Sequence, residues 1–242
     1  MNKWHSTALK YLCLTVLVLF GAPKINIKVG FFPLYLIDIL IFLTVFNAKN
    51  IASTAYQIPY KNIVNFVLIM ILSNELLNGI LIQNIFASIY IMIRMSLAVS
   101  LFFVIPKIIR NPKELLKVVK YGLAGAFITT LLLILSSLPM TRALSNIILS
   151  IPFLSPNSVS VSNVLLNSVD GGIRGTSLIG VSILSGAFLN VIWPFLFLIL
   201  NFYKPKGIFK LLLITTLVLT PVAITMTYSR GAILALFLIH FL

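Results

Sequence analysis

The chain has 242 residues, of which 60% are hydrophobic and only 9% are charged. A soluble domain of this length needs a charged surface, so the composition excludes a soluble globular protein and indicates that lipid surrounds the chain. The net charge is +14, with 18 basic residues against four acidic ones. The basic residues stand in short loops between apolar runs, which is how membrane orientation is encoded, so we expect no nucleic-acid partner. The single cysteine, Cys13, excludes an intrachain disulfide and a Cys metal cluster.

The apolar runs predict an all-α fold, a polytopic transmembrane bundle of seven full helices and a truncated eighth. In chain order we expect helices at about 8–22, 29–46, 62–79, 84–105, 117–138, 176–202 and 208–226. The first is a membrane helix rather than a signal peptide, because Phe20-Gly21-Ala22-Pro23 is a poor cleavage site. The eighth begins near 230 and has thirteen residues up to Leu242, fewer than the ~20 that a span needs. We therefore expect 1–242 to be a single membrane domain, the N-terminal part of a longer fold.

The basic residues in the loops predict the orientation. With the N-terminus inside, the inner loops hold twelve Lys and Arg residues and the outer loops hold five. This difference favours a cytoplasmic N-terminus. The one long loop, about 139–175, then faces outward, and its apolar stretch Ile147 to Leu154 is expected to lie along the membrane interface.

Two charged residues interrupt the apolar interior of the predicted helices. Asp38 is the tenth residue of the second helix and Arg94 is near the eleventh of the fourth, and both helices run from outside to inside. A charge at the bilayer centre costs ~2.5–3.5 kcal/mol on insertion scales, so we predict an Asp38–Arg94 ion pair. The pair either fixes helix packing or lines a polar cavity or proton path. Glu75, near the outer end of the third helix, either sits in the headgroup layer or reaches an outward-facing site.

The inner loop at 106–120 contains a signal for the start of a helix. Asn111 suits the N-cap, Pro112 suits the first helical position, and Glu114 stands where the acid of a capping box belongs. This signal is structural and indicates no chemistry.

Two outer helix starts each place an arginine beside a glycine. The segments are Asp170-Gly171-Gly172-Ile173-Arg174-Gly175-Thr176-Ser177 and Thr227-Tyr228-Ser229-Arg230-Gly231-Ala232. A helix N-terminus carries the positive pole of the helix dipole, which disfavours a cation but, with free N–H groups, favours an anion. An arginine adds a planar fork of donors for phosphate oxygens, and glycine allows close approach of the backbone. Each arginine either contributes to an outer anion site or anchors its helix to lipid headgroups.

At these residues the sequence resembles the O-antigen ligase and O-antigen polymerase superfamily. The resemblance rests on Arg174-Gly175-Thr176, followed by a Ser-rich apolar helix, and on Ser229-Arg230-Gly231-Ala232 about 56 residues later. It covers about 170–242; the preceding residues match only in being hydrophobic helices with a charged residue in the second.

The resemblance implies transfer or polymerisation of undecaprenyl-diphosphate-linked glycan at the outer face of the bacterial inner membrane. It implies no metal and no cofactor, because the lipid diphosphate is itself the leaving group. Arg174 and Arg230, with Gly175 and Ser229, would bind the diphosphate and stabilise its charge as the glycosidic bond breaks. Other polysaccharide assembly proteins would be partners. The motifs do not separate ligases from polymerases.

The chain departs from the family pattern at its end. Family members continue through a second large outer loop that supplies a basic or proton-accepting residue, whereas this chain stops within a helix, and His240 inside that helix does not replace it. We therefore expect a truncated reading frame or a fragment of a longer protein, with a chain that is inactive alone as one alternative. Two alternatives stay open: a transporter or flippase whose pathway is lined by Asp38, Arg94 and Glu75, and a non-catalytic membrane scaffold.

Overall fold

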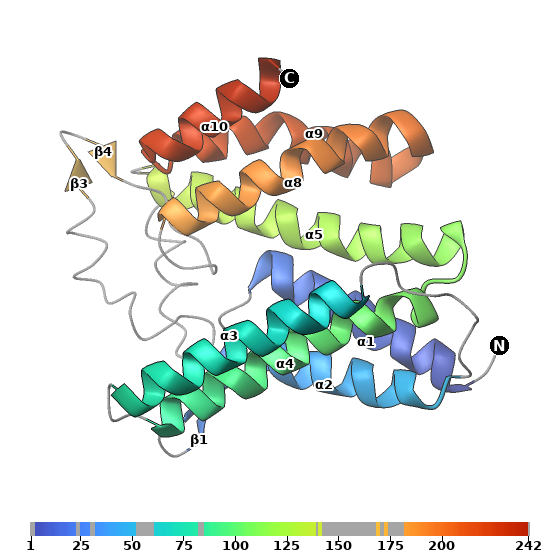
Figure 1. Cartoon of the computed structure of the whole chain (residues 1–242). Coiled ribbons are helices and arrows are strands. Elements are labelled where there is room, and N and C mark those ends of the chain that lie inside the picture. Colours follow the sequence, from blue (N-terminus) through green and yellow to red (C-terminus); the bar gives the residue numbers. More distant parts are fainter. Residues whose placement is uncertain are drawn as a thin grey trace. The chain divides into compact units, whose positions relative to one another are not determined.

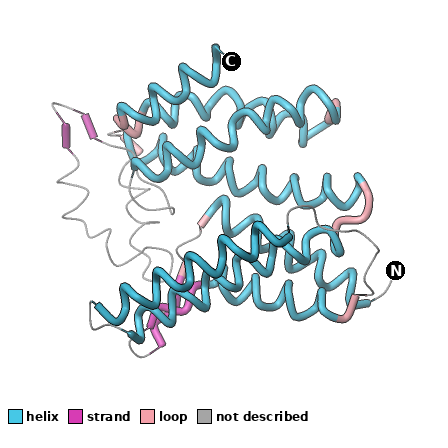
Figure 2. Tube along the Cα trace, viewed as in Figure 1, coloured by secondary structure: helices cyan, strands magenta, loops and turns pink. Residues whose placement is uncertain are grey.

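The described part of the chain is helical, with two short hairpins (Figures 1 and 2). The structure is a computed structural model, and it describes residues 3–22, 25–29, 32–51, 61–81, 85–138, 140–141, 168–169, 172–173 and 182–241. The helices are α1 (Lys3–Gly21), α2 (Leu36–Lys49), α3 (Lys61–Leu81), α4 (Ile85–Ile108), α5 (Pro112–Ser137), α8 (Ser182–Tyr203), α9 (Gly207–Thr225) and α10 (Arg230–Phe241). The predicted all-α fold class is confirmed.

Six of the described helices are long and apolar enough to cross a membrane. They are α1, α3, α4, α5, the Ser185–Tyr203 part of α8, and α9. Because a span is set by length and hydropathy, these six helices indicate a multi-pass membrane protein, as the composition predicts. Helix α10 has twelve residues within the described range and α2 has fourteen, so neither meets the length of a span.

The second predicted helix differs at its beginning. The sequence predicts a helix over 29–46, whereas the structure places two antiparallel strands, β1 (Asn26–Val29) and β2 (Phe32–Tyr35), before α2. Pro33, paired with Lys28 in the hairpin, has no N–H for a helix and constrains the residue before it. The backbone therefore becomes helical only at Leu36, and Asp38 stands in the first turn of α2 rather than in mid-helix.

Several predicted features of the outer loop fall outside the described residues. These are most of 139–175, including the stretch from Ile147 to Leu154, and the first residues of the helix predicted from 176. Within the loop the structure describes a second hairpin, formed by β3 (Ser168–Val169) and β4 (Gly172–Ile173). The two residues between them in sequence are Asp170 and Gly171, a pair that favours two-residue hairpin turns.

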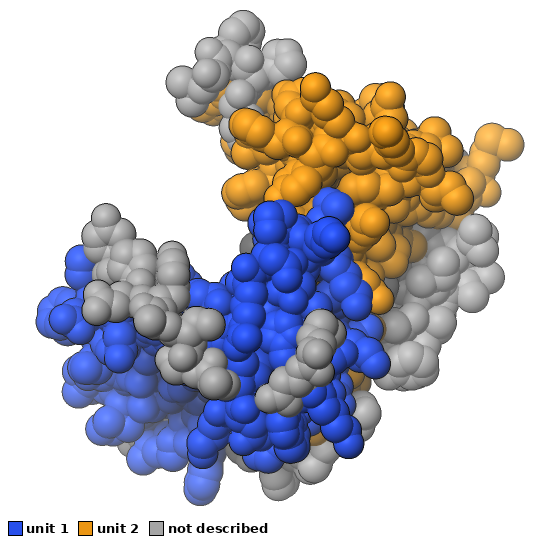
Figure 3. Space-filling view, turned by 90° about the vertical axis from the view of Figure 1, so that its right-hand side faces the viewer, with its two compact units in different colours: residues 1–15, 38–118 blue, residues 16–37, 119–242 orange. Residues whose placement is uncertain are grey.

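The chain divides into two compact units, coloured separately in Figure 3. Unit 1 comprises residues 1–15 and 38–118 and contains α3 packed against α4. Unit 2 comprises residues 16–37 and 119–242, and in it α8, α9 and α10 pack against one another. Each unit combines two separate segments of the chain, so the boundary between the units could not be predicted from a linker in the sequence.

In unit 2, glycine permits α1 and α5 to touch through their backbones. A Cβ atom added at Gly125 would lie 2.6 Å from the carbonyl oxygen of Leu17 and 2.9 Å from the nitrogen of Gly21. The approach also lets the Thr129 hydroxyl donate to the carbonyl of Phe20 at 2.7 Å. Small residues at helix contacts serve this purpose in membrane proteins, where packing rather than water exclusion joins helices.

Unit 2 also contains a helix proline whose missing hydrogen bond is replaced. Pro221 lies inside α9 and cannot donate to the carbonyl of Leu217, four residues earlier. The indole Nε1 of Trp193 on α8 donates to that carbonyl at 3.0 Å. The side chain of one helix thus satisfies the acceptor that a proline frees on its neighbour, as the membrane interior requires.

Candidate functional site

The turn between α9 and α10 is held by its own side chains. The Ser229 backbone N–H donates to Thr227 Oγ1 at 3.3 Å, and Thr227 Oγ1 donates to the carbonyl of Ile224 at 2.6 Å. Ser229 Oγ then accepts from the backbone N–H of Ala232 at 3.3 Å, which makes Ser229 the N-cap of α10. Tyr228 has φ +48°, in the left-handed region that non-glycine residues seldom occupy. These contacts fix the direction from which α10 begins.

Arg230 and Gly231 form the open start of α10. The Arg230 side chain is exposed, and no described residue accepts a hydrogen bond from the backbone N–H of Arg230 or Gly231. A Cβ atom added at Gly231 would meet no atom within 4 Å. Packing among the described residues therefore does not require glycine here, unlike at Gly125. Without a side chain, the backbone of Gly231 is accessible beside the Arg230 cation, at the positive end of the α10 dipole.

A groove of about 570 Å³ lies beside this helix start. It is lined by residues of α8, of α10 and of the preceding turn: Ala187, Asn190, Val191, Pro194, Ser229, Gly231, Ala232 and Ala235. The lining is mostly small and apolar, with Asn190 and Ser229 as its polar side chains. Its volume lies in the range of small-ligand sites.

Asn190 connects the two walls of the groove. Its side chain is 5% exposed, and Nδ2 donates to the carbonyl oxygen of Ala232, in the first turn of α10, at 2.7 Å. Its Oδ1 is buried without a hydrogen-bond partner. Gly186, one turn earlier on α8, keeps the helices close, because a Cβ atom there would lie 3.0 Å from Cβ of Ala232. Asn190 could not be predicted as a site residue, since nothing local in the chain distinguishes it from another polar residue of a membrane helix.

The structure describes one of the two predicted arginine motifs. Ser229 and Arg230 stand together at the start of α10. Arg174 and Gly175 lie outside the described residues. That Arg174 and Arg230 bind the same diphosphate thus stays a prediction.

In unit 1 the structure contains the predicted ion pair. Arg94 Nε lies 2.8 Å from Asp38 Oδ2, with the Asp38 side chain 13% exposed and that of Arg94 35% exposed. The guanidinium carbon of Arg94 also lies 5.7 Å from the ring centroid of Tyr90. Asp38 stands in the first turn of α2, where the helix dipole favours an acid. Two charges that are each costly in an apolar setting therefore neutralise each other.

Glu75 lies at the close contact between α3 and α4. Its Oε1 accepts a hydrogen bond from the Ser88 hydroxyl at 3.3 Å. A Cβ atom added at Gly79 would lie 2.5 Å from Ser88 Oγ, so glycine allows the two helices to meet there. This contact is separate from the Asp38–Arg94 pair, and nothing in it joins the two into a pathway.

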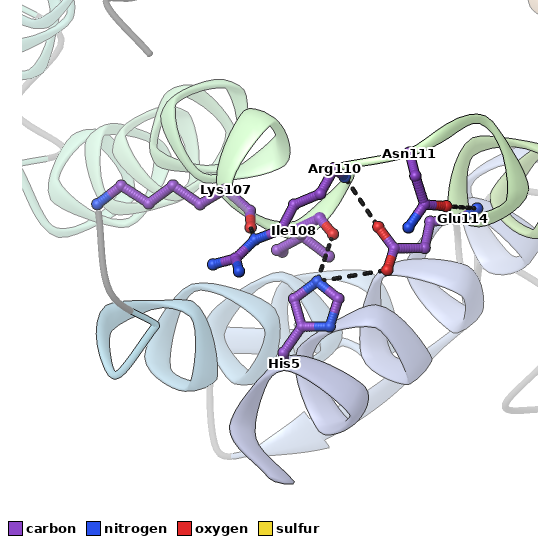
Figure 4. Close-up of polar contacts among 6 residues, drawn as sticks. All are labelled: His5, Lys107, Ile108, Arg110, Asn111 and Glu114. Carbon is purple, nitrogen blue, oxygen red and sulfur yellow. Dashed lines mark hydrogen bonds and ion pairs between the residues drawn. The ribbon is translucent and has the colours of Figure 1, made fainter. Parts of the chain in front are cut away.

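His5 joins the beginning of α1 to the junction between α4 and α5 (Figure 4). The ring is 3% exposed, and its Nε2 lies 2.9 Å from the carbonyl oxygen of Ile108 and 3.7 Å from Glu114 Oε1. Because the carbonyl only accepts, Nε2 carries the proton. Sequence reasoning found no role for His5, since its partner is 103 residues away.

The predicted helix start at α5 is present in the same cluster. Asn111 Oδ1 accepts from the backbone N–H of Glu114 at 2.9 Å, as an N-cap does. Glu114 Oε2 accepts from the backbone N–H of Arg110 at 2.8 Å, one residue before the position that a capping box uses. The cluster orders a helix end. Among the described residues, no group of three or more His, Cys, Asp and Glu side chains is placed to hold a metal ion.

Comparison of the chain with protein-family models, with curated proteins and with solved structures found no match.

Proposed function

We propose that this chain takes part in membrane glycan assembly at the outer face of the bacterial inner membrane, with its N-terminus in the cytoplasm. In this proposal it transfers or polymerises undecaprenyl-diphosphate-linked oligosaccharide units of an O-antigen, capsule or exopolysaccharide. The motif resemblance over about 170–242 supports the choice of chemistry. Other polysaccharide assembly proteins would be its partners.

The observation that carries the proposal is the open start of α10. Arg230, the bare backbone of Gly231 and two N–H groups without an acceptor among the described residues all point to an anion. A diphosphate matches them, since its oxygens accept from both a guanidinium fork and backbone amides. The adjoining groove leaves room for a second part of such a ligand beside the diphosphate.

The chemistry assigned to the site is the departure of a diphosphate. The bond between the anomeric carbon and the diphosphate oxygen breaks, and its electron pair goes to the diphosphate. An acceptor hydroxyl bonds to the anomeric carbon and releases its proton to water. Arg230 stabilises the growing negative charge, and Arg174 is the second cation that the resemblance supplies. Removing one such donor typically costs a roughly 10²–10³-fold loss of rate.

The transporter alternative has one observation in its favour, the ion pair at the start of α2. A helix that begins with an acid opposite a partly exposed cation resembles the interrupted helices of transporters. However, both charges of the pair are satisfied by each other, and Glu75 belongs to a separate contact. We therefore place the function at α10.

The test is the length of surface polysaccharide chains in cells that carry variants of this protein. Arg230→Ala and Arg174→Ala are expected to abolish long chains. Arg230→Lys retains charge but not the planar fork and is expected to restore them only in part. Lys210→Ala, which removes an exposed cation from α9, is the matched control and should leave chain length unchanged. Normal chains in both alanine variants, at normal protein abundance, would refute the site.

Gly231→Ala separates ligand binding from folding. A Cβ atom fits at this position and alanine is the better helix former, so the variant should be at least as stable as the wild type. The added methyl group nevertheless stands beside the proposed anion. We expect shortened polysaccharide with unchanged or raised thermal stability, and full-length polysaccharide would argue against close backbone approach.

A further inference from the structure

One wall of the groove carries a hydrogen-bond acceptor that the chain does not satisfy. Asn190 Oδ1 is buried and has no partner among the described residues, although the same amide donates through Nδ2 to Ala232. That donation fixes the amide, because turning it over would set Oδ1 against the Ala232 carbonyl oxygen. A buried acceptor without a donor costs free energy, so an unpaired one in a folded chain calls for an explanation.

A second acceptor stands at the same residue. Pro194, four positions after Asn190 on α8, has no N–H to offer to the main-chain carbonyl of Asn190. Both Asn190 and Pro194 line the groove. In α9, by contrast, the carbonyl that Pro221 frees accepts a hydrogen bond from the indole of Trp193. The chain thus provides a side-chain donor for the carbonyl that Pro221 frees, whereas next to Pro194 it forms a groove that Asn190 lines.

The groove selects the kind of donor that could meet these acceptors. Arg230 and the positive end of α10 stand on the side opposite α8, and both repel a cation. An ammonium group is therefore disfavoured, which leaves a neutral hydroxyl or amide N–H. The small apolar side chains of Ala187, Val191 and Ala235 leave room for such a group on a larger carrier.

We propose that the α8 wall of this groove, with Asn190 as the recognising residue, binds a hydroxyl or amide N–H of the first sugar attached to the lipid diphosphate. This inference rests on the proposed function, which places the diphosphate at Arg230. The sugar directly bonded to that diphosphate is the group that enters the adjoining groove. Asn190 then distinguishes a glycan-bearing carrier from a bare one.

The test measures binding of two probes to the purified full chain in lipid nanodiscs of phosphatidylglycerol and phosphatidylethanolamine. The probes are undecaprenyl diphosphate and undecaprenyl-diphosphate-linked N-acetylglucosamine, and native mass spectrometry reports their occupancy. The wild type should prefer the glycosylated probe. Asn190→Leu, of similar volume, should lose that preference by about three- to tenfold, the range expected for a neutral hydrogen bond, with binding of the bare probe unchanged. Arg230→Ala should weaken the binding of both probes.

The outcomes separate the two proposals. If Asn190→Leu still prefers the glycosylated probe, or if it loses affinity equally for both probes, then Asn190 only connects α8 to α10. Binding of the bare probe that is unaffected by Arg230→Ala would overturn the proposed function, whatever Asn190 does. If Asn190→Leu does not fold, Pro194→Ala decides, because it restores an N–H to α8 with a good helix former. It should lower the preference about twofold, and an unchanged preference would overturn the subsite.

Discussion

Asp38 and Arg94 illustrate how a membrane protein accommodates a charge, by giving it a partner of opposite sign. The Asp38 side chain is the more buried of the two, and the guanidinium and carboxylate atoms approach to 2.8 Å. Breaking such a pair leaves one charge without compensation, which costs more than the pair contributes.

Asp38→Asn and Arg94→Gln should therefore each destabilise the protein, by about 1–3 kcal/mol, less than for a fully buried pair because Arg94 is partly exposed. The double variant should recover most of the loss, since it removes both charges. Reversible unfolding in mixed micelles measures the four free energies of the cycle. Additive losses in the double variant would show that the two charges act independently.

The residues that sequence reasoning found differ in kind from those it missed. Asp38 and Arg94 were predictable as a pair because each is a lone charge in an apolar run. His5 and Asn190 were not, because their partners Ile108 and Ala232 are 103 and 42 positions away and nothing local marks the contact. A polar side chain in a membrane helix acquires its role from a neighbour that only the fold supplies.

Among the helices, α8 and α9 depend on each other through a proline and an indole. Trp193 donates to the carbonyl that Pro221 leaves free, so the hydrogen bond matters only while the proline is present. Trp193→Phe in the wild-type background should cost about 1–3 kcal/mol for the orphaned carbonyl, in addition to the packing loss.

In a Pro221→Ala background the cost of Trp193→Phe should fall to the packing loss alone, because the substituted alanine supplies its own backbone N–H to the Leu217 carbonyl within α9. Thermal unfolding of the four proteins in detergent gives the comparison. An equal cost in both backgrounds would mean that the indole hydrogen bond contributes nothing to stability.

The contact of α1 with α5 should tolerate no side chain at Gly125. A Cβ atom there meets backbone atoms, which cannot rotate away as a side chain would. We expect Gly125→Ala to lower the stability by more than about 1 kcal/mol, as overpacking does. Gly231→Ala, the matched substitution at an open glycine, should change it by less than about 0.5 kcal/mol. Similar melting temperatures for the two variants would contradict the close approach.

The boundaries of the helices show which local signals were reliable. The capping residues Asn111 and Pro112 predict the start of α5 correctly, whereas the apolar pattern alone suggests a start near 117. The β1–β2 hairpin was missed because its apolar residues look like the first turns of a membrane helix. Only Pro33 indicated otherwise, and one proline at the edge of a run is a weak signal.

For the molecule as a whole, hydropathy was sufficient for the fold class and insufficient for the division into units. Length and apolar content define six candidate spans among the described helices, since a bilayer imposes a minimum length on any helix that crosses it. Each unit is formed by two segments that the other unit separates in sequence, an arrangement that depends on packing and cannot be read from composition.

The predicted orientation places Lys206 inside and Thr225 outside. Single cysteines at these exposed positions, in a Cys13→Ala background, should respond differently to a membrane-impermeant maleimide. In intact spheroplasts the reagent should label Thr225→Cys and spare Lys206→Cys, and both should react once the membrane is permeabilised. The reverse pattern would invert the topology and place Arg230 in the cytoplasm.

The short length of α2 has a consequence for the lipid around it. Fourteen helical residues rise about 21 Å, well below the ~30 Å thickness of a hydrocarbon core. Through the ion pair, the first turn of α2 lies beside Arg94. Arg94 is the tenth residue of α4, which is long enough to span the membrane. Helix α2 therefore crosses only part of the hydrocarbon core, and its apolar length is too short for a thick bilayer. Of two phosphatidylcholines that differ only in acyl length, the shorter should favour the folded protein.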